Sequence, residues 1–179
     1  MRDDKSRIGD FSSVNDAFPG GILADEILTP GPKQVKALFV TGGNPLITMA
    51  NSGRLREAFQ QLELLVCLDI FQNETCSEAH YVLPCTDPLQ RPDLPFIFPL
   101  MLGLQMKPYL QATKAIYEPV GQQRDEATIY LDLAKASGIS IFNSAIAQRF
   151  FEMTRRYHAM RKKKSYPGLP QEAYLNGLL

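Results

Sequence analysis

Lys36-Ala-Leu-Phe-Val-Thr-Gly-Gly-Asn-Pro45 is the stretch that decides the fold, together with Leu64-Leu-Val-Cys-Leu-Asp69 further along the chain. Each is a short apolar run; the first ends in a Gly-Gly turn, the second in an aspartate, and a segment with helical periodicity lies between them. Strand, glycine turn, helix and strand in this order build a parallel sheet, which binds ligands at the carboxyl ends of its strands. We therefore predict an α/β fold with a nucleotide site at this edge.

The candidate site residues follow the two strands. Gly42 and Gly43 allow a tight turn and close approach of a ligand's phosphates, because neither carries a Cβ atom. Pro45 disfavours the α region for Asn44 and so holds the turn extended. Asp69, at the tip of its strand, is expected to accept hydrogen bonds from a ribose or a base. Simpler interpretations are a turn without a ligand and a solvated cap, but the shared position at adjacent strand ends favours binding.

Periodicity predicts the remaining elements. Helices are expected at residues 22–28, from 52 or 53 to 61, within 73–79, at 125–137 and at 143–163, and strands at 37–40, 64–68 and 81–83. Three short strands separated by helical segments indicate a mainly parallel sheet. The first strand is expected to be buried, because it is short and uniformly apolar.

Three helices have a predicted core face. Four side chains on the helix ending at 61 recur at helical spacing: Leu55, Ala58, Phe59 and Leu62. The helix at 125–137 is expected to begin at Asp125, to bury Ile129, Leu133 and Ala136, and to end at Gly138. In the last helix the spacing predicts a core-facing stripe rather than a coiled coil, formed by Ile146, Phe150, Met153, Tyr157 and Met160.

Composition excludes several classes of protein. The 179 residues are 45% hydrophobic and 21% charged with a formal net charge of zero, which is ordinary for a globular protein and does not favour nucleic acid. The three cysteines and two histidines match no metal motif, so no metal ligand is predicted and the thiols indicate a reducing, cytoplasmic compartment. No signal peptide is recognised behind the charged N-terminus.

A proline-rich segment follows the predicted sheet. Seven prolines lie between residues 84 and 119, which predicts a long functional loop over 85–121. Its apolar part, residues 94–110, is too short and too interrupted for membrane insertion, which takes ~20 apolar residues. It is expected to pack either on the domain's own surface or on a partner domain, and to be a route to self-association. The predicted organisation is a flexible segment 1–20, one domain 21–164 and a tail 165–179.

No arrangement of catalytic residues is recognised. The turn lacks the third glycine of a G-x-G-x-x-G fingerprint and the lysine of a P-loop, which disfavours ordinary NAD or NTP binding.

Three stretches together resemble the third domain of the molybdopterin oxidoreductases, the dimethyl sulfoxide reductase family. They are Ala37-Leu-Phe-Val-Thr-Gly-Gly-Asn-Pro45, Leu64-Leu-Val-Cys-Leu-Asp-Ile-Phe-Gln-Asn-Glu-Thr75 and Ala79-His-Tyr-Val-Leu-Pro84. The resemblance covers roughly residues 20–140. It implies a three-layer, Rossmann-like domain that holds the guanosine end of one molybdopterin guanine dinucleotide, with molybdenum or tungsten in the full-length enzyme.

The resemblance also implies site residues. Gly42, Gly43 and Asn44, followed by Pro45, would line the phosphate and ribose region, Asp69 would recognise guanosine, and Glu74-Thr75 would shape the adjacent loop. The chain departs from the family pattern at His80 and Gln90, where a carboxylate is frequent in the family.

Family members are several times longer. The resemblance therefore implies a fragment whose partners are the remaining domains of a parent oxidoreductase, any iron–sulfur cluster lying in those domains. The fragment by itself is not expected to turn over, and no catalytic residue is assigned in it. The alternatives are a Rossmann-type NAD(P)-binding domain and a non-enzymatic interaction domain.

Overall fold

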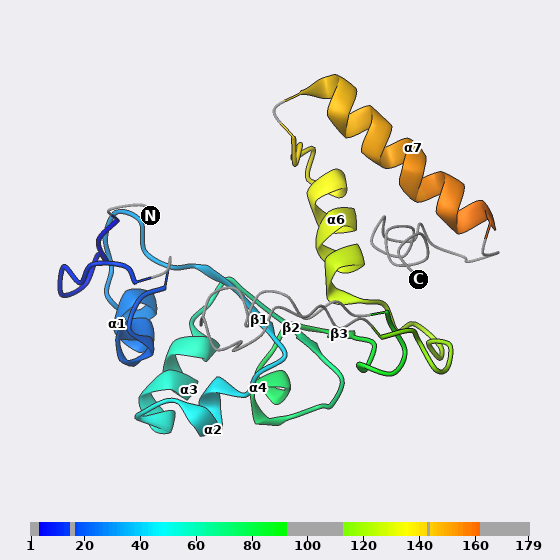
Figure 1. Cartoon of the computed structure of the whole chain (residues 1–179). Coiled ribbons are helices and arrows are strands. Elements are labelled where there is room, and N and C mark those ends of the chain that lie inside the picture. Colours follow the sequence, from blue (N-terminus) through cyan, green and yellow to red (C-terminus); the bar gives the residue numbers. More distant parts are fainter. Residues whose placement is uncertain (1–3, 15–16, 93–112, 143, 162–179) are drawn as a thin grey trace, which may run out of the picture. The chain divides into compact units, whose positions relative to one another are not determined.

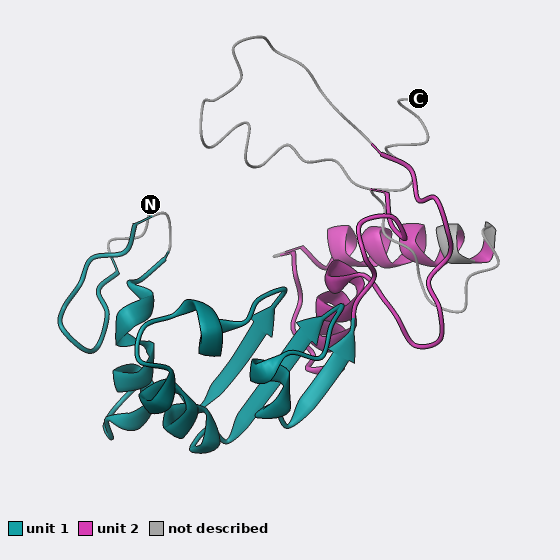
Figure 2. Ribbon diagram, turned by 90° about the horizontal axis from the view of Figure 1, so that it is seen from below, with its two compact units in different colours: residues 1–84 teal, residues 85–179 magenta. Residues whose placement is uncertain are grey.

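The structure, a computed structural model, describes residues 4–14, 17–92, 113–142 and 144–161 (Figure 1). Contacts group the chain into two compact units, Met1–Pro84 and Cys85–Leu179 (Figure 2). The predicted boundaries at residues 20 and 164 stay a prediction. The tail 165–179 and the apolar stretch 94–110 lie outside the described residues, so the predicted self-association does too.

A parallel sheet lies at the centre of unit 1. Its three strands are β1 (Ala37–Thr41), β2 (Leu64–Asp69) and β3 (Tyr81–Pro84), in the order β1-β2-β3. Leu38 pairs with Leu65, and Cys67 pairs with Val82. Parallel neighbours cannot be joined by a hairpin, so helical segments connect them. The predicted α/β class, a parallel sheet flanked by helices, is confirmed.

β2 is the buried strand of this sheet. Its four middle side chains are at most 5% exposed: Leu65, Val66, Cys67 and Leu68. The prediction that residues 37–40 form a buried strand is wrong, because β1 lies at the edge of the sheet and Phe39 is 41% exposed. An apolar run does not distinguish a central strand from an edge strand.

The described part of unit 1 contains five helical segments, and three of its α-helices, α1, α2 and α3, contribute to one core. The five segments are the 3-10 helix η1 (Gly20–Ile22) and the α-helices α1 (Leu23–Leu28), α2 (Pro45–Thr48), α3 (Ser52–Gln60) and α4 (Glu74–Ser77). Leu55, Ala58 and Phe59 of α3 are buried, as their spacing predicts. They pack with buried side chains of α1, α2 and β2, namely Ala24, Ile27, Leu46 and Leu65. This cluster fixes the loops at the strand ends.

α2 is not predicted from the sequence. It begins directly after Asn44, whose φ of −125° and ψ of 72° lie outside the α region, as expected before a proline. Pro45 itself occupies the first helical position, where its fixed φ and missing N–H suit a helix. The same dipeptide therefore ends the extended turn and starts a helix.

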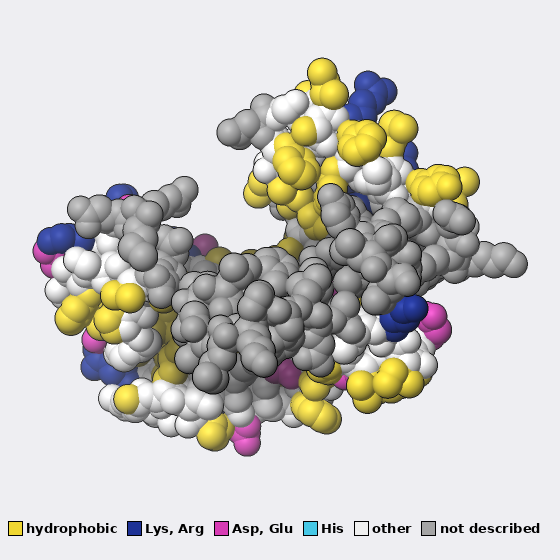
Figure 3. Space-filling view, in the orientation of Figure 1, with side chains coloured by type: hydrophobic (Ala, Val, Ile, Leu, Met, Phe, Trp, Pro, Cys, Tyr) yellow, Lys and Arg dark blue, Asp and Glu magenta, His cyan; other side chains and the backbone are white. Residues whose placement is uncertain are grey.

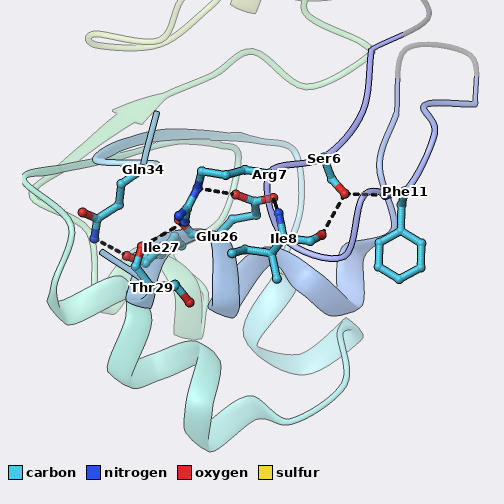
Figure 4. A network of polar contacts seen from close by, with 8 residues as sticks. All are labelled: Ser6, Arg7, Ile8, Phe11, Glu26, Ile27, Thr29 and Gln34. Atoms are coloured by element: carbon cyan, nitrogen blue, oxygen red, sulfur yellow. Dashed lines mark hydrogen bonds and ion pairs between the residues drawn. The ribbon is translucent and has the colours of Figure 1, made fainter. Parts of the chain in front are cut away.

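The segment before α1 is held against that helix by Arg7 (Figure 4). Its Nε lies 3.1 Å from Oε2 of Glu26, and its Nη2 donates to the carbonyls of Glu26 at 2.8 Å and Thr29 at 2.9 Å. The other Glu26 oxygen accepts from the Ile8 N–H at 2.8 Å. Both charged side chains are largely buried, so this pair and its backbone partners anchor residues 7 and 8.

Unit 2 contains the helices α6 (Glu126–Ala136) and α7 (Ala145–Arg161). The predicted start of α6 is confirmed: the Asp125 carboxylate accepts from the Thr128 N–H at 2.9 Å and caps the helix. Gly138 follows the helix with a φ of +69°, as expected for a residue that ends it.

The predicted core faces of these two helices are corrected by the structure. In α6, Ile129 is buried but Leu133 and Ala136 are exposed, and Thr128 is buried in their place. All five side chains of the predicted α7 stripe are exposed. Periodicity shows which side chains share a helix face, but it does not show which face a neighbour covers. Among the described residues, no helix combines the length and apolar character required to cross a membrane.

Candidate functional site

The site begins where β1 and β2 end side by side. Thr41 pairs with Leu68, and the Gly42 N–H donates to the Leu68 carbonyl at 2.8 Å, so the ladder continues into the glycine turn. Gly42 has a φ of +57°, a conformation that glycine adopts without strain. Gly43 does not share it. The turn therefore depends on Gly42, whereas Gly43 is the residue whose missing side chain leaves space.

The size of this space follows from the atoms that a Cβ added at each glycine would contact. At Gly42 nothing lies within 4 Å, and at Gly43 the nearest atom is the Thr41 carbonyl oxygen at 3.9 Å. Among the described residues, the backbone hydrogen bonds include no acceptor for the Gly43 N–H. A ligand oxygen could approach this donor without displacing a protein side chain.

Asp69 lies at the end of β2, as predicted, and its carboxylate organises the next loop. Oδ1 accepts from the N–H groups of Ile70 at 2.7 Å and Phe71 at 3.1 Å, and Oδ2 accepts from Nδ2 of Asn73 at 3.0 Å. The side chain is half-buried. Each carboxylate oxygen has more than one lone-pair direction, so these bonds leave acceptor capacity for a ligand.

Asn73 is a site residue that the sequence analysis did not single out. Its Nδ2 donates to Asp69 and also lies 3.4 Å from the Gly43 carbonyl, while its Oδ1 accepts from the Cys76 N–H at 3.0 Å. The last bond makes it the N-cap of α4. The capping position could be recognised in the sequence, but the link to the glycine turn depends on the fold.

Asn44 joins the glycine turn to α4. Its Nδ2 donates to the Glu74 carboxylate at 2.6 Å, and its Oδ1 accepts from the Thr75 hydroxyl at 2.8 Å. The same hydroxyl lies 3.2 Å from the Leu46 N–H, which donates to it. Thr75 is 0% exposed and Pro45 is also buried. The side chains of these two predicted site residues are therefore buried and support the loops.

Glu74 is an exposed carboxylate held in its charged form. Hydrogen bonding from its own backbone N–H and then from the Asn44 amide lowers the pKa of this carboxyl below its ordinary value. Arg56 contributes a smaller effect of the same sign. The carboxylates of Glu74 and Asp69 therefore make the two loops acceptors of hydrogen bonds. They do not form a basic site for anions.

The cysteines are not candidates for a metal or a nucleophile. Cys67, Cys76 and Cys85 are buried thiols. Burial, and then the neighbouring Cys76, raise the pKa of the Cys67 thiol to about 12, which keeps it protonated and unreactive. Within the described ranges, no group of three or more metal-ligating side chains is found.

The two departures from the family pattern have structural partners. His80 accepts the Leu65 N–H through Nδ1 at 2.9 Å, beside the backbone bond from its own N–H to the Leu65 carbonyl. Gln90 is 6% exposed, and its amide donates to the Gln123 side chain at 2.8 Å. At Gln90 a carboxylate could not donate this bond and would bury a charge, whereas the bond that His80 accepts is one that a carboxylate could also accept.

Comparison with known proteins gives the family. Residues 13–136 match the family model for molybdopterin oxidoreductase. The chain belongs to this family. The match includes every predicted site residue and excludes α7.

Individual relatives are similar over part of their length. The probable oxidoreductase YyaE of Bacillus subtilis is 26% identical over 83% of this chain and 21% of its own length. Trimethylamine-N-oxide reductase of Haemophilus influenzae is 28% identical over 69% of this chain and 16% of its own. The solved structure of acetylene hydratase from Pelobacter acetylenicus has a TM-score of 0.56 and 27% identity, over 67% of this chain and 16% of that one. The chain thus spans about a fifth or less of the length of these proteins.

Proposed function

We propose that the loops after β1 and β2 bind the guanosine diphosphate end of a molybdopterin guanine dinucleotide, in a longer molybdenum- or tungsten-dependent oxidoreductase. The family supports the molybdopterin part. One observation supports the nucleotide end: hydrogen bonds join the two loops at adjacent strand ends, from Asn73 to Gly43 and Asp69, and from Asn44 to Glu74. The carboxyl edge of a parallel sheet is the usual position for a nucleotide.

The two carboxylates fit a guanosine better than a bare phosphate. Guanine presents N–H donors along its Watson–Crick edge, and ribose presents hydroxyl donors, whereas a phosphate oxygen offers these carboxylates no donor. Asp69 is placed to accept such donors because hydrogen bonds to its own loop fix the carboxylate. In this proposal Asp69 selects the base and Glu74 lies nearer the ribose.

The diphosphate is assigned to the glycine turn. A phosphate oxygen can accept from the Gly43 N–H, and the space around Gly42 and Gly43 allows that approach. Asn44 keeps the turn in place by holding α4, and Thr75 and Pro45 act only through this support. The assignments of Gly43 and Asp69 agree with the roles that the family resemblance implies for them, whereas Asn44 and Pro45 are assigned support instead of direct contact.

A bound molybdopterin would supply the metal-centred chemistry, and this chain would supply binding and orientation. The relatives' names include a reductase and a hydratase, so the domain does not determine the reaction. Substrate and electron partner belong to the parent protein. Unit 1 contributes a fixed attachment point for one end of the cofactor.

Titration calorimetry of the full chain with GDP, compared with ADP, tests the proposal. We expect GDP to bind more tightly. Asp69→Ala should weaken GDP binding by about 10- to 150-fold, because a hydrogen bond to a charged group contributes roughly 1.5–3 kcal/mol. Glu63→Ala is the matched control: it removes an exposed carboxylate of unit 1 that pairs with Lys36.

Equal affinity for GDP and ADP, or unchanged GDP binding in the Asp69 variant, would reject the guanosine assignment. Mass spectrometry of the nucleotide released by the parent protein is an independent measurement, in which we expect a guanine nucleotide.

A further inference from the structure

An exposed apolar stripe on α7 is left unexplained by the proposed function. The α7 stripe consists of Ile146, Phe150, Met153, Tyr157 and Met160, whose side chains are between 57% and 83% exposed. Figure 3 shows hydrophobic side chains gathered over the part of the molecule where Figure 1 labels α7. Such a contiguous apolar surface usually marks an interaction site.

The opposite face of α7 is already occupied by α6 and the loop between them. Arg155 is 2% exposed and donates to Asp132 of α6 at 3.1 Å. Oε2 of Glu152 lies 3.1 Å from Nζ of Lys135 in α6. The rings of Phe142 and Phe151 pack edge to face, with centroids 5.4 Å apart. These contacts fix which face of α7 is exposed in the described part of the chain.

The stripe is narrow, which distinguishes a helix partner from a membrane. Its members recur at intervals of four, three, four and three residues, the a and d pattern of a heptad seam. Small or polar side chains, Ala147 and Thr154, flank one side, and Arg149 and Arg156 flank the other. A helix that lies in a lipid interface needs a broader apolar face than this two-in-seven seam.

The flanking charges indicate the chemistry of the partner. Arg149 and Arg156 are exposed, and no ion pair involves either among the described residues. In an antiparallel pair of identical helices they would face each other. In a parallel pair Arg149 would face Thr154. Neither arrangement offers these arginines an acidic partner, and like charges oppose the antiparallel pair.

We propose that the α7 stripe binds an amphipathic helix of another polypeptide, with apolar residues at its a and d positions and Asp or Glu at the flanking positions. The apolar seam supplies the contact area, and Arg149 and Arg156 supply orientation and selectivity. This inference is independent of cofactor binding, because α7 lies outside the residues 13–136 that match the family model.

Fluorescence anisotropy of labelled peptides with the full chain tests this proposal. The probe is a three-heptad peptide with Leu at a and d and Glu at e and g, whose own charges disfavour its self-association. The control peptide carries Lys at e and g. We expect saturable binding of the Glu peptide, at least about tenfold tighter than that of the Lys peptide, and weaker binding at high salt.

Variants of the chain locate the contact. Phe150→Ser/Met153→Ser should abolish binding of the Glu peptide, with far-UV circular dichroism confirming that α7 stays helical. Ile116→Ser is the matched control, because it removes a 75% exposed apolar side chain of unit 2 outside α7. Arg149→Glu/Arg156→Glu should reverse the preference between the two peptides.

Three results would overturn the proposal. One is the absence of preference between the Glu and Lys peptides, or of binding to either. Another is a concentration-dependent dimer in sedimentation that the stripe variant abolishes, which would identify a second copy as the occupant. The third is binding to phosphatidylglycerol vesicles that competes with the Glu peptide.

Discussion

Gly42 and Gly43 are adjacent in sequence but differ in conformation. Gly42 has a φ of +57° and Gly43 lies outside the left-handed region. We expect Gly42→Ala to lower the free energy of unfolding by about 1–2 kcal/mol, because a Cβ disfavours this conformation. Gly42→Asn should lose less, since asparagine tolerates it.

Gly43→Ala is the matched control for that prediction. It should leave the unfolding free energy nearly unchanged, because its Cβ would make only an ordinary contact with Thr41. Urea denaturation compares the three variants. A loss of stability at Gly43 equal to that at Gly42 would contradict the assignment of the strained position.

Asp69 and Asn73 allow the structural and binding roles of the carboxylate to be separated. Asp69→Asn by itself would place two amide groups against each other. Combined with Asn73→Asp, it restores a hydrogen bond in the reverse direction, and an aspartate at 73 can still cap the Cys76 N–H. We expect the double variant to recover the stability that Asp69→Asn loses.

GDP binding should not be recovered in the double variant, because the charge has moved away from position 69. Thermal denaturation and GDP titration measure the two roles on the same protein. If the double variant binds GDP like the original chain, the carboxylate at 69 does not select the base.

Among the elements, α4 links pH to stability through its first residue. Glu74 begins the helix, and hydrogen bonds from its own N–H and from Asn44 lower its pKa below the ordinary value of 4.5. Its folded form therefore binds a proton less readily than its unfolded form. This contribution to stability is fully present above pH 4.5 and is lost as the pH falls through the folded pKa.

Glu74→Gln should reduce the slope of unfolding free energy against pH between the folded pKa of Glu74 and pH 4.5. At pH 8, and below the folded pKa, the slope should change little. Urea denaturation at a series of pH values measures it, with Glu63→Gln as a control at an exposed carboxylate outside α4. A steeper acid slope in the Glu74 variant would contradict the sign of this effect.

The elements also show what the sequence could and could not predict. The strands, α3, the cap at Asp125 and the stop at Gly138 follow from local spacing and turn chemistry, and all are present. β1 was expected to be buried and the α7 stripe to face a core, and both are exposed. Local pattern determines an element's type and its apolar face, whereas its neighbours depend on contacts between residues distant in sequence.

The site was predictable to a similar degree. Position at a strand end was sufficient to select Gly42 and Asp69, which lie together as expected. It did not distinguish Thr75 and Pro45, which are buried supports, and it did not find Asn73. Hydrogen bonds between Asn73 and the glycine turn join residues from different loops, so no local signal contains them.

For the whole molecule, the reaction rates of the buried cysteines with a thiol reagent measure how readily each unit unfolds locally. Cys67 and Cys76 belong to unit 1 and Cys85 to unit 2. At pH 8 we expect slow reaction of all three with a thiol reagent, because burial blocks access and holds Cys67 protonated with a pKa of about 12. Cys67 and Cys76 should react at one common rate, since the two buried thiols are neighbours in unit 1.

Mass spectrometry of peptides after timed labelling resolves each thiol. Urea should accelerate all three reactions, and the rate at Cys85 gives a separate measure for unit 2. Rapid labelling of Cys67 in the absence of urea would contradict the buried position of β2.

The order of the strands has a consequence for how the chain is made on the ribosome. β1 pairs with β2, and β2 pairs with β3, both in parallel, so neither pairing can form as a hairpin while synthesis continues. Ala37–Thr41 has therefore emerged as an unpaired apolar segment well before Leu64–Asp69 is available to it. We therefore expect a pause in translation between the two strands to lengthen the exposure of β1 to aggregation.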